Sequence, residues 1–124
     1  MLAPTPKTKE YTMNTVCDLT DRHCKPCEGG VAPMSREEAE STMDQIPGWV
    51  LSDDARTISQ RFEFKGFYKT MAFINAMAWI ANSENHHPDF SAGYNFCEVN
   101  FTTHAIDGLS ENDFICAAKI SDLL

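Results

Sequence analysis

Basic residues are scarce in this sequence. Its 124 residues include 10 Lys and Arg against 18 Asp and Glu, which gives a formal net charge of −8. Nucleic-acid binding depends on clustered Lys and Arg side chains that neutralise phosphates. The acidic balance therefore argues against a nucleic acid as a direct partner.

Long hydrophobic runs are also missing. No apolar stretch approaches the roughly 18 residues that a transmembrane helix needs. The first residues, MLAPTPKTKEY, lack the apolar core of a secretory signal. We therefore expect no membrane partner and a soluble intracellular protein, located in the cytoplasm, with the nucleus as an alternative.

The cysteines do not form an obvious set of pairs. There are five of them, and the chain has no recognisable export signal, so a disulfide framework is disfavoured. The stretch CDLTDRHCKPC holds three cysteines and a histidine, which could bind zinc. Because it contains only one CxxC motif, free thiols are the favoured interpretation for Cys17, Cys24 and Cys27. Cys97 and Cys116 fall at apolar positions and are expected in the core.

The pattern of the sequence changes at about residue 34. Residues 1–33 are polar, show no periodicity and hold four of the six prolines. They are predicted to form an irregular N-terminal extension. Residues 34–124 carry the periodic apolar pattern and are long enough for one domain with a modest core.

Periodicity and helix-breaking residues predict the elements of this domain. The first is a helix with Ser35 as N-cap and Glu38 at capping-box spacing, and it ends at Pro47–Gly48. It is followed, in order, by strands at 49–52 and 57–64, a long helix at 67–85, one or two strands within 91–104, and a helix from Ser110. Short links between strands favour an antiparallel sheet with helices on one face, an α+β fold.

The long helix is apolar over an unusually wide surface. Its apolar residues form two stripes, one of Phe67, Met71, Ile74, Ala78 and Ala81 and the other of Phe73, Met77 and Ile80. Such a helix is covered on more than one side, and in so small a domain a sheet covers only one. We therefore expect a second subunit to cover part of the rest.

Two of the four histidines are adjacent, in the stretch SENHHPDF at residues 83–90. Histidine can donate and accept protons near neutral pH, and Pro88 holds His87 in extended geometry where the helix ends. Metal binding is disfavoured, since adjacent histidines point in different directions and helical zinc pairs are usually four residues apart. Surface histidines without a function are the alternative.

Two further residues are candidates for the same site. His104 shares its strand parity with Asn100 and Thr102 rather than with the apolar residues, so we expect it on the open sheet face or at a strand end. If that end meets the end of the long helix, three imidazoles converge. Asp113 stands three residues after Ser110, where a helix-capping role and a functional role are both open.

Three separated blocks, NHHPDF, YNFCEVNFTTH and DGLSENDF, resemble the signature of the pterin-4a-carbinolamine dehydratases in order and spacing. The resemblance covers about residues 35–122. It implies a four-stranded antiparallel sheet with about three helices on one face. It also implies a homodimer or homotetramer, formed through the sheet edge and the helices.

The resemblance also implies an activity. Members of this family dehydrate 4a-hydroxytetrahydropterin to the quinonoid dihydropterin in tetrahydrobiopterin recycling, without a metal or a cofactor. By position, His86 and His104 match the acid/base histidines, and His87 matches the catalytic-site histidine credited more with substrate binding. The other positions that match the pterin pocket are Asn85, Pro88, Phe90, Thr102, Thr103, Ala105 and Asp113.

Three positions depart from the family pattern. Phe90 stands where a tryptophan is common, Asn82 where many relatives have a glutamate, and Asn85 where some have an aspartate. The resemblance leaves a second function class open, because some relatives are binding or assembly proteins and one in animals stabilises dimers of a homeodomain transcription factor. The presence of all three histidines favours the enzyme, and a protein partner remains an additional hypothesis.

Overall fold

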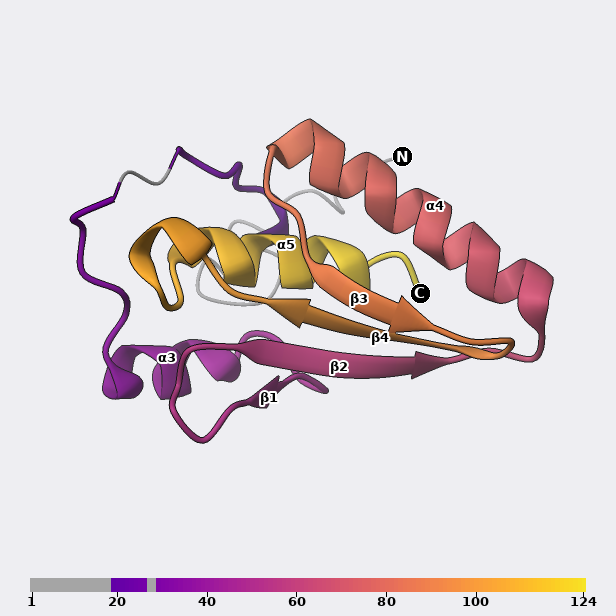
Figure 1. Ribbon diagram of the computed structural model, residues 1–124, viewed down its shortest axis with the longest axis horizontal. Coiled ribbons are helices and arrows are strands. Elements are labelled where there is room, and N and C mark those ends of the chain that lie inside the picture. Colours follow the sequence, from indigo (N-terminus) through magenta and orange to yellow (C-terminus); the bar gives the residue numbers. More distant parts are fainter. Residues whose placement is uncertain (1–18, 27–28) are drawn as a thin grey trace, which may run out of the picture.

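The computed structural model describes residues 19–26 and 29–124 (Figure 1). Its elements are, in order, α3 (Arg36–Met43), β1 (Val50–Leu51), β2 (Ile58–Glu63), α4 (Phe67–Glu84), β3 (Asp89–Ala92), β4 (Phe96–Phe101), the 3₁₀ helix η1 (His104–Ile106) and α5 (Glu111–Ser121). The predicted α+β fold is confirmed. Within the described ranges no helix combines the length and the apolarity that crossing a membrane requires.

The four strands form one antiparallel sheet in the order β1-β2-β4-β3. The central strands β2 and β4 pair along their whole length, from Ile58 opposite Phe101 to Glu63 opposite Phe96. Strand β3 lies at one edge, and all four of its residues are exposed. Among residues 19–26 and 29–124, the sheet therefore ends, beside the histidine-rich segment, in a strand that pairs on one side only.

The strands expected within residues 91–104 lie closer to the N-terminus than predicted. Strand β3 begins at Asp89, because Pro88 holds the chain extended immediately after the helix. Strand β4 ends at Phe101, after which Thr103 pairs with Gly108 and encloses a short turn. His104 consequently begins η1 and is not part of a strand.

Helix α3 begins as predicted. The Ser35 side chain accepts from the Glu38 N–H at 3.1 Å, and the Glu38 carboxylate accepts from the Ser35 N–H at 2.9 Å. The helix ends at Met43, earlier than expected, and tight turns continue to Ile46. Pro47 accounts for this, since a proline disfavours helical geometry in the residue before it.

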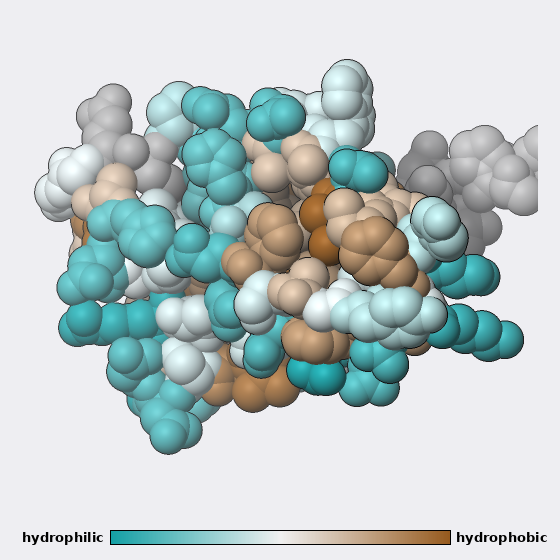
Figure 2. Space-filling view, turned by 45° about the vertical axis from the view of Figure 1, so that its right-hand side comes forward, coloured by the Kyte–Doolittle hydropathy of each residue, from teal (hydrophilic) through white to brown (hydrophobic). Residues whose placement is uncertain are grey.

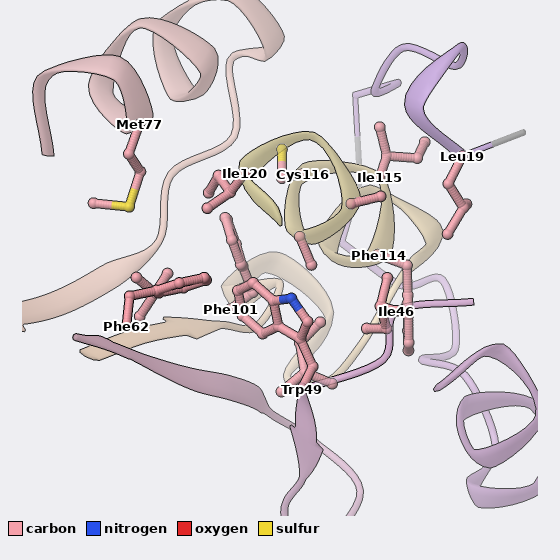
Figure 3. Close-up of a cluster of buried hydrophobic side chains, with 14 of the residues drawn as sticks. Leu19, Ile46, Trp49, Phe62, Met77, Phe101, Phe114, Ile115, Cys116 and Ile120 are labelled. Atoms are coloured by element: carbon pink, nitrogen blue, oxygen red, sulfur yellow. The ribbon is translucent and has the colours of Figure 1, made fainter. Parts of the chain in front are cut away.

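The core lies between one face of the sheet and helices α4 and α5 (Figure 3). Trp49 contacts Phe62 and Phe101, with ring centroids 5.9 and 6.0 Å apart, and donates from Nε1 to Ser121 Oγ at 2.8 Å. Because Ser121 ends α5, this bond ties the last helix to the start of the sheet. Cys97 and Cys116 are buried and free, as predicted.

The segment 19–26 also contributes to the core. Leu19 is 1% exposed and belongs to the same cluster, and Figure 3 shows it near Ile115 of α5. The chain therefore contacts the core well before residue 34. Cys17 and Cys27 lie outside the described residues, so the free-thiol and zinc interpretations of the first cysteine group remain predictions.

Helix α4 has a buried face and an apolar outer face. Thr70, Phe73, Met77 and Ala81 are buried, which agrees in part with the two predicted stripes. Trp79, in contrast, is 73% exposed. Apolar side chains reach the surface on the side of the molecule shown in Figure 2. The outer apolar surface of α4 is thus left without a cover by the residues that the structure describes.

Candidate active site

The end of helix α4 places the first histidine of the pair. Asn85 has φ 54° and ψ 42°, a left-handed conformation that ends the helix and that Asn tolerates better than most residues. The following His86 N–H still bonds to the Ala81 carbonyl at 3.1 Å. The His86 ring stacks on Phe101 of β4, with centroids 5.8 Å apart and planes inclined by 7°. Its side chain is only 12% exposed.

A buried carboxylate holds the His86 ring. His86 Nε2 lies 2.7 Å from Asp113 Oδ1, and the Asp113 side chain is fully buried. Asp113 Oδ2 accepts from Thr103 Oγ1 at 2.7 Å and from the Ser110 N–H at 3.0 Å. An ionised carboxylate only accepts hydrogen bonds, so His86 donates from Nε2 and keeps Nδ1 as an acceptor. Asp113 therefore caps α5 and orients His86 at once.

The other two histidines lie at the surface. His87 is exposed, and His104, at the start of η1, has a side chain that is 78% exposed. His104 Nε2 is 3.6 Å from Asp89 Oδ2, on a side chain that is itself 76% exposed. A contact of this kind is worth little in water, so the protein fixes His104 much less firmly than His86.

All three histidines line one cavity of about 550 Å³, a size suited to a small organic ligand. The structure thus brings together the helix end and the strand end, as the sequence suggested. The cavity is lined by Cys24, Lys25, Pro26, Ser83, Glu84, Asn85, His86, His87, Thr102, His104, Ala105 and Asn112.

Four of the expected pocket residues do not line this cavity. Pro88 and Phe90 line a smaller neighbouring hollow of about 190 Å³, which shares His87 with the first. Thr103 is 4% exposed and Asp113 is fully buried. Both lie beneath the cavity, where they can act on a ligand only through His86 or the backbone.

The sequence indicates Glu84 as a residue that could orient an imidazole, but it gives no sign of the contacts between Glu84, the N-terminal segment and Lys119. The Glu84 side chain is 5% exposed and accepts from the Cys24 N–H at 2.7 Å and from His23 Nδ1 at 2.9 Å, while Lys119 Nζ lies 3.6 Å away. Burial alone would raise the pKa of Glu84, but the Cys24 N–H, the His23 ring and the Lys119 ammonium together hold that pKa below its ordinary value. Glu84 is therefore a buried anion that binds the N-terminal segment.

The cavity does not have the donor set of a metal site. Among residues 19–26 and 29–124, no group of three or more His, Cys, Asp or Glu side chains is arranged to hold a metal ion. What the arrangement offers is one fixed imidazole, two exposed imidazoles and a small cavity between them. These groups suit proton transfer to and from a small bound molecule.

These features define a class: small α+β proteins with a histidine-lined cavity at one end of an antiparallel sheet. Residues 32–123 match the family model described as Pterin 4 alpha carbinolamine dehydratase. The chain belongs to this family of hydro-lyases. A relative from Nitrosomonas eutropha, provisionally named pterin-4-alpha-carbinolamine dehydratase, is 59% identical over 113 residues, 90% of this chain and 98% of its own. One from Legionella pneumophila with the same provisional name is 54% identical, over 86% of this chain and 96% of its own.

Solved structures agree with this assignment. A protein from Brucella melitensis described as a transcriptional coactivator/pterin dehydratase superposes with a TM-score of 0.70 at 27% identity, over 73% of this chain and 97% of that one. A pterin dehydratase-like protein described as a RuBisCO assembly factor of the alpha-carboxysome has a TM-score of 0.54 at 21% identity, over 61% and 88%. The second likeness shows the shared fold alone.

Proposed function

We propose that this protein is a 4a-hydroxytetrahydrobiopterin dehydratase that uses histidine acid/base catalysis. Family membership supports dehydratase activity on a pterin. The observation that supports the mechanism best is the pair formed by His86 and the buried Asp113, at the wall of a cavity that His87 and His104 also line.

The reaction breaks the C4a–O bond of the carbinolamine. The hydroxyl leaves as water after taking a proton from an acid, a base removes a ring N–H proton, and the nitrogen electron pair forms the C=N bond of the quinonoid product. No net oxidation or reduction occurs. Both proton transfers take place near neutral pH, which suits imidazole groups.

We assign the base to His86 and the acid to His104. With Nε2 donating to Asp113, His86 has Nδ1 available to take a proton, and the Asp113 carboxylate stabilises the imidazolium that results. His104 lines the same cavity with an exposed ring, so it can approach a bound substrate as the proton donor. His87, also exposed on the same cavity, contributes to substrate binding.

We further propose that the protein works as a homodimer or homotetramer in the cytoplasm. The open edge of β3 offers backbone groups for pairing with a second sheet. The outer face of α4 carries Trp79, which is 73% exposed, and Phe67, which is 49% exposed. Light scattering after size-exclusion chromatography tests this, and a monomer at micromolar concentration would contradict it.

The decisive experiment is a stopped-flow dehydration assay with synthetic 4a-hydroxytetrahydropterin. We expect a rate well above the spontaneous background. A rate equal to the background would instead favour a binding or assembly protein on the same scaffold, in line with the coactivator description of the Brucella melitensis structure.

A further inference from the structure

The segment of residues 19–26 is held against the cavity by contacts along its length. Lys119 Nζ donates to the Thr20 carbonyl at 2.9 Å, and Arg22 pairs with Glu111. Leu19, at one end of the segment, is buried in the core beside α5. Figure 1 shows the segment, in indigo, beside the C-terminal end of α4 and near α5.

The other end of the segment forms backbone hydrogen bonds to buried side chains. The Cys24 N–H donates to Glu84 Oε1 at 2.7 Å. The Lys25 N–H donates to Asn112 Oδ1 at 3.0 Å, and Asn112 Nδ2 donates back to the Lys25 carbonyl at 2.5 Å. Asn112 is 7% exposed and Glu84 5%. Breaking these bonds would leave buried polar groups unsatisfied, which is costly.

This well-anchored segment also forms part of the cavity wall. Cys24, Lys25 and Pro26 line the same cavity as His86, His87 and His104. The family model begins only at residue 32. The match to the Nitrosomonas eutropha relative covers 90% of this chain and therefore includes residues 19–26.

We propose that residues 24–26 form a wall of the pterin-binding site, and that Leu19 and Lys119 are positioning residues that hold this wall in place. The inference rests on the proposed function, since it assigns the cavity to the pterin. The segment contacts neither His86 nor Asp113 in any of these bonds, so it acts on substrate binding and leaves the proton transfers to the histidines. Loss of the wall therefore raises KM and leaves kcat nearly unchanged.

The test uses two variants that detach the segment without altering a cavity-lining residue. Leu19→Ala removes the buried anchor. Lys119→Met removes the bond to the Thr20 carbonyl and the 3.6 Å contact with Glu84, which itself binds the segment. The matched controls are Leu51→Ala, which truncates a half-buried leucine on β1, and Lys69→Met on the exposed side of α4. Lys119→Met keeps the test valid if Leu19→Ala fails to fold.

Two measurements are made on each full-length variant. Hydrogen exchange at the Cys24 and Lys25 amides reports whether the segment is released, and steady-state dehydration gives KM and kcat separately. We expect faster exchange and a rise in KM of about tenfold in both detaching variants, corresponding to the loss of one or two hydrogen bonds to the substrate or to the wall. The controls should match the wild type in both measurements.

Several results would overturn the inference. Unchanged exchange in both detaching variants would show that Leu19 and Lys119 do not position the segment. Faster exchange with unchanged KM, or with a fall in kcat alone, would show that the segment is not a wall of the binding site. Each of these requires an active wild type, whereas a wild type with no rate above background would overturn the proposed function and this inference with it.

Discussion

The two histidines assigned to proton transfer differ sharply in how they are held. His86 is 12% exposed, stacks on Phe101 and bonds to a fully buried carboxylate. His104 is 78% exposed, and its neighbour Asp89 is 3.6 Å away and equally exposed. One half of the site is therefore fixed by buried contacts, while the other half is held only by an exposed contact. The fixed half is the one that must present a single nitrogen in a defined tautomer.

Removing each histidine should reveal this difference most strongly. His86→Ala and His104→Ala should each lower kcat by at least about 100-fold, since each removes an acid/base group. Only His86→Ala should also destabilise the fold, by about 1–3 kcal/mol, because it leaves Asp113 buried with one partner fewer. Stopped-flow assays and urea denaturation measure the two effects. Full activity in both variants would show that the assignment is wrong.

Changing the carboxylate beneath His86 tests the fixed half alone. In Asp113→Asn, the amide oxygen should face the two donors, Thr103 Oγ1 and the Ser110 N–H, which turns the NH₂ group towards His86 Nε2. His86 would then carry its proton on Nδ1, the wrong tautomer for a base there. We expect kcat to fall by about 100-fold.

The matched change in the exposed half is Asp89→Asn. Because Asp89 and His104 are both largely in water, we expect kcat to change by less than about threefold. Nitrogen-15 NMR of the imidazole groups can report the His86 tautomer directly. An unchanged tautomer in Asp113→Asn would contradict the role given to Asp113.

The pH dependence of stability extends the comparison to two carboxylates, the buried Glu84 and an exposed glutamate. Its pKa is lowered in the folded protein from an ordinary value near 4.5, so its contribution to stability is present above that value and is lost as the pH falls through the lower, folded-state pKa. Glu84→Gln should cost about 2 kcal/mol at pH 7, and this difference should shrink below about pH 4.5. Denaturation at several pH values measures it. Glu40→Gln, an exposed change on α3, should show no such trend.

The smallest expected effect is a difference in reactivity among the cysteine thiols. The pKa of Cys116 is raised, first by its hydrogen bond with the Cys24 thiol and then by burial, and burial raises the pKa of Cys97. Both should react slowly with iodoacetamide in the native protein, because the thiolate is the reactive form. The half-buried Cys24 should react faster. Peptide mapping by mass spectrometry separates the sites, and equal rates at all three would contradict this ordering.

Local signals in the sequence predicted much of the fold. The Ser35–Glu38 and Ser110–Asp113 spacings correctly marked two helix starts, because a capping box involves only neighbouring residues. The absence of Pro and Gly between Phe67 and Glu84 predicted the long helix to within one residue. These are properties of short stretches of chain and need no tertiary structure.

The contacts of the site could be predicted only in part. The sequence singled out His86 and Asp113 separately, but their bond joins residues 27 positions apart and leaves no periodic signal. The link between Cys24 and Glu84, 60 positions apart, was missed entirely, because the polar residues before position 34 have the composition of an extension. Long-range polar pairs of this kind depend on the folded geometry rather than on any local pattern.

The left-handed conformation of Asn85 limits how this cavity can vary. Gly, Asn and Asp adopt φ 54° with less steric strain than most other residues. Asn85 also lines the cavity. The backbone at the end of α4 therefore favours an amide, a carboxylate or no side chain at this point of the cavity wall.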